Sequence, residues 1–443
     1  MPVSTLLMIA VLEMVFFLLL AKSFVFGMAF VVLVSSMFLL FLFPEVGLVA
    51  PFTGNIILFV FFDTFKVDIT APVVIAYFAL MTLGVGLYYA KRMDHAQLEL
   101  GTPFWLSISI GLVMIIGLAY SSNRTYGISK ILFYFIYNVP LLAVPLIFRN
   151  DLKKLEHLLV FGYLVGIFLG LICLSIEGER LIQYQRFSPS DSVNPIFLAR
   201  SLGISGLCAF FLLVKTRGIF LKFLILASLP ILFIPMIWSG SRAPFAGMIL
   251  ILFLFYLLQP SEPLFRKIIV SSIGLVGAIF FLAIFASQIA ARLVTPVAQD
   301  TSTAFRFIAW IQAAEQFMGA PLTGIGTGSF FLDNPIIPLI YPHNLALELA
   351  CEHGIIGLIL ISAFIYISIK SGFQNIKYYA QAESNQYLQL SIMVLCLFFY
   401  SLMNSMFSGD ITYNYLVWLT AGFIRVMHLS KNMNQVQFEA LAK

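Results

Sequence analysis

Two arginines and one histidine are the residues that point most directly to chemistry. Arg242 lies in a very short stretch between two apolar runs, and Arg306 lies in a long polar and aromatic segment that also contains His343. A guanidinium group matches phosphate oxygens in two-point geometry, and a neutral imidazole can accept a proton. The two arginines could therefore grip a pyrophosphate group, and the histidine could act as a general base.

Each of these residues also has a structural explanation that the sequence leaves open. We expect His343 in the first turn of a helix, where the positive end of the helix dipole favours neutral imidazole, but a histidine there could equally cap an interfacial helix. Arg242 or Arg306 could anchor a helix end by snorkelling. Arg200 lies inside an apolar run and is a functional candidate for that reason. It could instead reach the membrane interface or pair with Asp191.

Two further patterns in the long segment favour structure over chemistry. Residues 324–328, with Gly326 at their centre, lack the lysine and the preceding strand of a phosphate-binding loop. They predict a tight turn, either near a substrate or of plain turn geometry. Glu348 and Glu352 are four residues apart and could form the carboxylate pair of a glycosidase. A structural role is favoured, in which Glu352 orients the helix of His343 or pairs with an arginine on the same side of the membrane.

Metal and cofactor chemistry are not expected. The four cysteines have no metal-site spacing, and no outer loop contains an Asp-x-Asp motif. The net charge of +5 is small and scattered, so nucleic acid is not an expected partner. We therefore expect no metal, no cofactor and no nucleic acid.

The composition predicts an all-α polytopic membrane protein. Hydrophobic residues make up 61% of the 443 residues, charged residues make up 10%, and the mean hydropathy is +1.01. A soluble domain is closer to half apolar and a quarter charged. Fourteen apolar runs are long enough to span, and because the first three are short or close together we expect 12–14 transmembrane helices. The runs are 6–21, 24–43, 47–62, 69–90, 104–120, 131–148, 158–176, 195–214, 219–238, 244–258, 268–287, 355–370, 387–407 and 411–427.

The chain divides into a helix bundle over 1–287, a loop over 288–354 that carries the active site, and C-terminal helices with a tail over 355–443. Lysine and arginine gather in alternate loops, which the positive-inside rule assigns to the cytoplasm. The long loop then faces the outside. Within it, the spacing predicts a helix over 303–317 and a second helix from about His343 to Gly354.

An ordered set of short motifs resembles the bacterial O-antigen ligase and O-antigen polymerase superfamily. Each motif is weak alone, but the set keeps the family's order and lies on one expected face of the membrane. The motifs are Arg186 with Asn194, Pro195 and Ala199, residues 239–243, Arg306 with Trp310, residues 324–330, His343 with 344–347, and Glu352 with 354–357.

This resemblance implies a metal-independent glycosyltransferase of the bacterial inner membrane, with its active site facing the periplasm. The donor would be a glycan on undecaprenyl diphosphate, and the acceptor of a ligase would be the lipid A–core oligosaccharide. A polymerase of the same superfamily would use another lipid-linked glycan and remains the alternative. Arg242 and Arg306 would hold the diphosphate, and His343 would take the acceptor proton, with inversion. Substrate-binding residues would be Arg186, Asn194, Trp310, Gly326, Asn344 and Glu352.

Two other classes of function remain open. A transporter of lipid-linked glycans predicts ionisable residues in the middle of several spans. Apart from Glu13 and Arg200 the predicted spans have few of them. A membrane scaffold without chemistry would leave the outer arginines and histidine unexplained.

Overall fold

We describe the protein from a computed structural model of the full chain. The described residues are 48, 56, 99–176, 187–190, 193–260, 263, 265–269, 272, 301–333, 338–382 and 384–441. The predicted runs 6–21, 24–43 and 69–90 lie outside them, as does Arg186, and the runs 47–62 and 268–287 lie almost entirely outside. The predicted total of 12–14 spans therefore stays a prediction.

The described part of the chain is helical, with one isolated bridge between Leu332 and Leu339. Among the described residues, seven helical segments are long and apolar enough to cross a membrane, and two shorter apolar helices overlap the predicted runs 244–258 and 411–427. The predicted polytopic helical membrane protein is confirmed. The elements are α5 (Gly101–Leu118), α6 (Arg124–Phe133), η4 (Tyr134–Asn138), α7 (Val139–Ala143), η5 (Val144–Phe148), α8 (Lys153–Ser175), α10 (Pro195–Lys215), α11 (Ile219–Trp238), α12 (Arg242–Leu257), α15 (Thr301–Gly319), α16 (Leu345–Gln381), α17 (Asn385–Ser405) and α18 (Leu416–Leu441).

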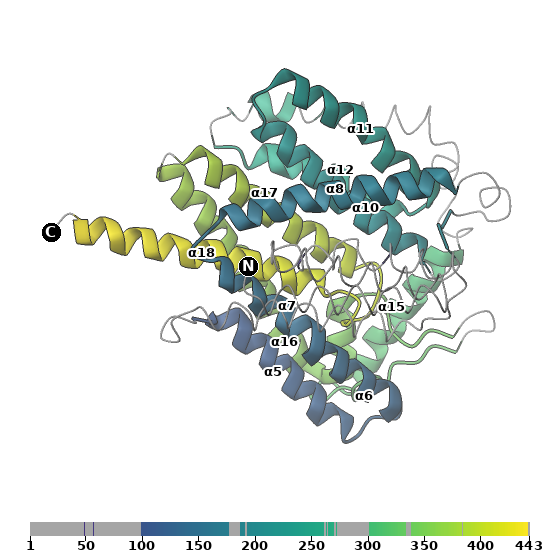
Figure 1. The fold of residues 1–443 in the computed structure, drawn as a ribbon. Coiled ribbons are helices and arrows are strands. Elements are labelled where there is room, and N and C mark those ends of the chain that lie inside the picture. Colours follow the sequence, from purple (N-terminus) through teal and green to yellow (C-terminus); the bar gives the residue numbers. More distant parts are fainter. Residues whose placement is uncertain are drawn as a thin grey trace, which may run out of the picture.

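The helices form two groups that α17 joins (Figure 1). In one group α10 packs against α8, α11 and α12, and in the other α16 packs against α5, α15 and α18. The second group has an aromatic centre at Trp418, which is fully buried. The Trp418 ring meets Tyr134 edge-on at 5.5 Å and stacks on Phe364 at 5.6 Å, and its indole N–H donates to Ser107 Oγ at 2.9 Å. This satisfied aromatic cluster ties α5, η4, α16 and α18 together.

The two ends of the bundle differ. At one end Glu156, at the start of α8, accepts hydrogen bonds from Lys215 at the end of α10 and from Gln386 at the start of α17. The opposite end holds the start of α10, the α11–α12 turn, α15, the start of α16 and the end of α17. We call this opposite end the site end, because Arg242, Arg306 and His343 all belong to it.

The two helices predicted in the long segment are both present. The predicted helix over 303–317 is α15, which runs over Thr301–Gly319. The second helix begins at Leu345 rather than at His343, because Asn344 is its N-cap. Helical geometry breaks at Gly354, with φ 63° and ψ −153°, as predicted, but the helix then continues to Gln381 as the span predicted over 355–370.

Candidate functional site

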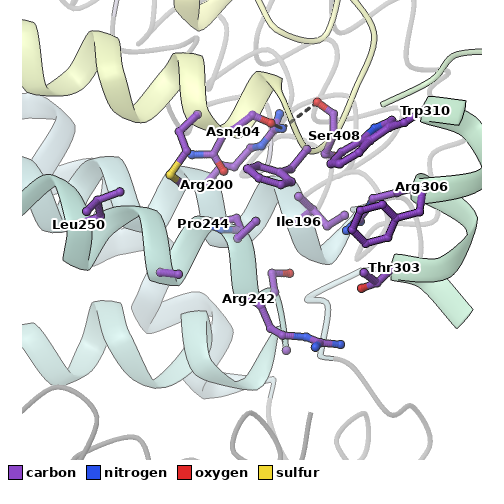
Figure 2. A pocket seen from close by; sticks show the side chains of 17 residues that line it. Ile196, Arg200, Arg242, Pro244, Leu250, Thr303, Arg306, Trp310, Asn404 and Ser408 are labelled. Carbon is purple, nitrogen blue, oxygen red and sulfur yellow. Dashed lines mark hydrogen bonds between the residues drawn. The ribbon is translucent and has the colours of Figure 1, made fainter. Parts of the chain in front are cut away.

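A pocket of about 430 Å³ at the site end brings Arg242 and Arg306 together with Arg200 (Figure 2). Its walls come from the start of α10, the α11–α12 turn, α15 and the end of α17. Figure 2 shows that the labelled side chains come from these separate elements. Residues distant in the sequence therefore line one cavity that has three guanidinium groups in its wall.

Arg242 is held by a constrained turn. It is the first residue of α12, and Gly240 before it has φ 62°, a conformation that glycine adopts without strain. The hydroxyl of Ser239 accepts a hydrogen bond from the backbone N–H of Ser241 at 3.2 Å. The hydroxyl of Ser241 in turn donates to the carbonyl of Pro195 at 3.2 Å. The turn is thus fastened to α10, and the N-terminus of α12 adds its own positive potential beside Arg242.

Trp310 fixes the pocket face of α15. It lies one helical turn after Arg306, and both residues line the pocket. The Trp310 ring contacts Phe307 at 5.2 Å and Phe407 at 5.8 Å between centroids. Its indole nitrogen is buried and has no acceptor in the described part of the chain. A buried donor without an acceptor is costly, so an oxygen atom of a bound molecule would stabilise this face of the pocket.

Arg200 is a structural cation in the pocket wall. It is 5% exposed, and its Nη2 donates to the carbonyls of Asn404 and Ser408, the latter at 2.9 Å. Its Nη1 donates to Asn414 Oδ1 at 3.3 Å. The guanidinium therefore fastens the turn after α17 and does not reach out to the membrane interface.

His343 is neutral, but for a reason that differs from the prediction. It precedes the N-cap of α16 and has φ 58°, so the expected position in the first helical turn is wrong. The pKa of His343 is lowered to about 4, mainly by burial. The positive charges of Arg306 and Arg200 also lower it, whereas the negative charge of Asp410 raises it. Its ring meets Tyr341 at 4.5 Å, and its buried Nδ1 has no hydrogen-bond partner among the described residues.

Both asparagines predicted to bind substrate act as N-caps. Asn194 Oδ1 accepts from the backbone N–H of Ile196 at 2.8 Å at the start of α10. Asn344 Oδ1 accepts from Leu347 N–H at 3.0 Å, and its amide nitrogen donates to the carbonyl of Met406 at 3.2 Å. Such caps satisfy helix N–H groups that lack partners within the helix. Asn344 thereby also ties the segment of His343 to the end of α17.

The glycine turn that contains Gly326 lies between α5 and α16 and is hydrogen-bonded to both. The N–H groups of Gly326 and Thr327 donate to the carbonyls of Glu352 at 2.9 Å and Gly117 at 3.3 Å. Gly326 has φ 97°, and a Cβ there would lie 2.9 Å from the Gly117 oxygen. These N–H groups are bonded to protein carbonyls, so the turn has the plain turn geometry that the sequence favoured.

A buried ion cluster beneath the site end was not predicted. Lys130 Nζ lies 2.6 Å from Glu348 Oε1 and 2.7 Å from Glu352 Oε2, and the three side chains are at most 1% exposed. Glu352 therefore pairs with this lysine rather than with an outer arginine. The signal in the sequence was the spacing of the two glutamates, which places both on one helix face where burial would require a cation.

The ion cluster and the pocket share the turn over residues 406–415. Glu348 Oε1 accepts from Ile411 N–H at 3.3 Å, and the Tyr126 hydroxyl donates to Asp410 Oδ2 at 2.7 Å. Asp410 Oδ1 also accepts from the N–H and the hydroxyl of Thr412 at 3.0 and 2.7 Å. Asp410, which the sequence analysis did not single out, thus organises this turn. The Gly-Asp-x-Thr order is a local turn signal that could have identified it.

Comparison with known proteins shows a family similarity in one part of the chain. Residues 226–362 match the family model described as O-Antigen ligase. This part of the chain is therefore similar to the O-antigen ligase family. The matched residues contain Arg242, Arg306, His343 and the glycine turn, in agreement with the resemblance drawn from the motifs. Arg200 and Asp410 lie outside the matched span.

One curated relative has a name that refers to polysaccharide ligation. The chain is 28% identical over 245 residues to a Rickettsia conorii protein named "Putative polysaccharide ligase RC0486". The alignment covers 50% of this chain and 56% of the relative, so the chain spans about half the length of the curated protein that it matches.

Proposed function

We propose that this protein transfers an O-antigen glycan from undecaprenyl diphosphate to the lipid A–core oligosaccharide, at the periplasmic face of the bacterial inner membrane. The observation that carries this proposal is the pocket that Arg242 and Arg306 both line, with His343 outside its lining but close enough for the charge of Arg306 to lower its pKa. The O-antigen ligase match supports the same reaction class. The basic loops on the opposite side of the predicted spans support the periplasmic orientation.

In the proposed reaction the acceptor hydroxyl oxygen attacks the anomeric carbon of the donor sugar. The bond between this carbon and the phosphate oxygen breaks, and undecaprenyl diphosphate leaves with the bonding electron pair. His343 takes the proton of the hydroxyl as the new glycosidic bond forms, and attack from the face opposite the leaving group inverts the anomeric carbon. Arg242 and Arg306 stabilise the negative charge that develops on the diphosphate.

The site is built so that little has to move during this step. Arg242 is the first residue of a helix, and the turn before it is fixed by hydrogen bonds. Trp310, one helical turn after Arg306, packs between Phe307 and Phe407. Arg200 adds a fixed positive charge. Charges that are already oriented toward a developing anion stabilise it without reorganisation, which is often the largest contribution to catalysis. The catalytic segment is then 288–354, between a helix bundle over 1–287 and C-terminal helices over 355–443, and its end coincides with the helix break at Gly354.

The pH dependence follows from the lowered pKa of His343. The base acts only when it is unprotonated, and its pKa is about 4 instead of the ordinary 6.5. We expect kcat/KM to stay constant from pH 8 down to about pH 6 and to fall by half only near pH 4. The measurement is transfer at a series of pH values, with folding checked at each by size-exclusion chromatography. An acidic limb centred near 6.5 would contradict the role of His343.

Removal of divalent metal ions is expected to leave the transfer rate unchanged, because arginine side chains supply the positive charge around the leaving group in this proposal. The measurement is the initial rate with and without an excess of EDTA. A magnesium-dependent glycosyltransferase in the same buffer serves as the control that must lose activity. A loss for this protein, restored by added Mg²⁺, would refute the metal-independent reaction.

The deciding experiment is transfer by purified protein in lipid, supplied with an undecaprenyl-diphosphate glycan from its own host. Parallel tubes contain either lipid A–core or no second acceptor, with the wild type beside His343→Ala. A product that requires lipid A–core and disappears in the variant would establish the ligase. Longer lipid-linked chains without added core would instead make it a polymerase. No product in either tube would turn attention to transport of the lipid-linked glycan.

A further inference from the structure

The outward face of α15 is apolar except for Glu315. Phe307, Ile308, Ile311, Met318 and Leu322 are 46, 47, 59, 74 and 71% exposed. Positions 308, 311, 318 and 322 follow the three- and four-residue spacing of one helix face, and Leu322 lies just beyond the helix end. We call these five residues the apolar face of α15. Ile311, from the stripe that predicted this helix, therefore points away from the protein, whereas Phe307 is partly exposed and also lines the pocket.

The apolar face is not needed for packing within the described residues. Ala309 and Ala313 already form the inner face of α15, against Phe330 and Cys351 in a small core of their own. A third face carries Arg306 and the pocket. A surface helix in water carries polar residues on its outer side, whereas this helix has a single acidic residue, Glu315, among its outward side chains.

The apolar face continues into the exposed side of a membrane-spanning helix. The backbone N–H of Ile355 donates to the carbonyl of Pro321 at 2.8 Å, which joins the end of α15 to α16. Ile355, Ile356 and Ile359, which follow on α16, are 37, 52 and 58% exposed. The α16 helix is long and apolar enough to span a membrane. Its exposed isoleucines are therefore expected to face lipid, and Leu322 extends the same surface onto α15.

The place of α15 in the fold fits a helix that lies along a membrane surface. Figure 1 shows it at the side of the molecule where α8 ends, crossing the end of the bundle rather than running through it. A helix with one apolar face and one polar face, located at the end of a bundle, can lie in the interface plane with its apolar side among the lipids.

We propose that the apolar face of α15 binds bilayer lipid and lies at the boundary between headgroups and acyl chains. The continuity with α16 favours lipid over a second copy of the chain as the occupant. Arg306 lies on a neighbouring face of the same helix, so the pocket is at the depth of the lipid phosphates. This last point rests on the proposed function: the diphosphate of the donor reaches the pocket while its polyprenyl chain stays in the membrane.

The depth of the apolar face can be measured without any transfer assay. Single cysteines at Ile311, Met318 and Leu322 would carry a nitroxide label in proteoliposomes, and collisions with oxygen and with a water-soluble nickel chelate would be recorded by electron paramagnetic resonance. Asp333→Cys, at an exposed loop position, is the water control, and Ile359→Cys is the control within a span. The four native cysteines are buried, and unmodified protein measures any labelling of them.

Preferential collision with oxygen, at a depth between the two controls, is the expected result. Collision with the nickel chelate as frequent as at Asp333→Cys would overturn the proposal, because the face would then lie in water. Broadening of the nitroxide spectrum by the label on a second copy of the protein, without collision with oxygen or the nickel chelate, would also overturn the proposal. The face would then be an interface between two copies. A lipid with a photoactivatable acyl chain needs no substitution and should label residues 307–322 of the native chain as well as 355–359; labelling of 355–359 alone would refute the proposal.

A kinetic measurement separates this inference from the proposed function. The double variant Ile311→Gln with Met318→Gln weakens the apolar face without touching the pocket. We expect the KM for the lipid-linked donor to rise several-fold while kcat is unchanged. If the labels report lipid contact but no transfer is found with any donor, then the proposed function fails and the lipid-binding face stands.

Discussion

Replacement of Arg306 by alanine is expected to abolish glycan transfer while the protein remains folded and inserted. Removal of one preorganised donor to a developing anion typically lowers kcat by about 10²–10³-fold, and Arg306 also contributes charge beside His343. Alanine is a good helix former, so α15 should persist. Arg242→Ala and His343→Ala are expected to have the same effect. The measurement is the initial rate of transfer in proteoliposomes that contain equal amounts of inserted protein.

Two further variants make this result specific. Arg306→Lys keeps the positive charge but loses the planar fork, so it should recover only part of the rate. Arg124→Ala removes an exposed arginine at the start of α6, also at the site end but outside the pocket, and should transfer as the wild type does. Full activity of Arg306→Ala would remove Arg306 from the mechanism.

Replacement of Lys130 by methionine is expected to cause the largest loss of stability. It leaves the carboxylates of Glu348 and Glu352 buried without their cation. Breaking a buried ion pair by removal of one partner typically costs about 3–5 kcal/mol, because the remaining charge is left in a low-dielectric interior. The measurement is the thermal unfolding midpoint in detergent, followed by fluorescence-detected size-exclusion chromatography.

The matched control is Lys215→Met. Lys215 also pairs with a glutamate, Glu156, but its side chain is 38% exposed, and a pair of this kind contributes about 0–1 kcal/mol. A triple variant, Lys130→Met with Glu348→Gln and Glu352→Gln, replaces all three ionisable groups and should regain much of the lost stability. Equal midpoints for Lys130→Met and Lys215→Met would show that the buried cluster does not stabilise the fold.

Local patterns predicted much of the architecture because they act within one element. Continuous apolar runs predicted the described spans, and the helical spacing of Phe307 and Ile311 predicted α15. The same spacing did not reveal which side of α15 would be buried. Ala309 and Ala313 form the packed side, because small residues allow close approach to Phe330, while the larger side chains remain outside.

The site was only partly predictable, because its decisive contacts are long-range. Lys130 and Glu352 are 222 positions apart, and no local pattern joins them. Lys130 directly precedes a predicted span, where a lysine is commonly an interfacial anchor. The neutral state of His343 was predicted, but its cause was not, since burial and the charges of Arg306 and Arg200 depend on how distant segments assemble.

The helix break at Gly354 has a consequence for protein engineering. Its φ of 63° and ψ of −153° belong to a region that is essentially restricted to glycine, and a Cβ there would lie 2.5 Å from the carbonyl oxygen of Leu322. The helical register above this residue is therefore independent of the register below it. A chimera that takes the segment before Gly354 from a related protein should be joined at Gly354, where a new sequence can enter without rotating the exposed side of the helix that follows.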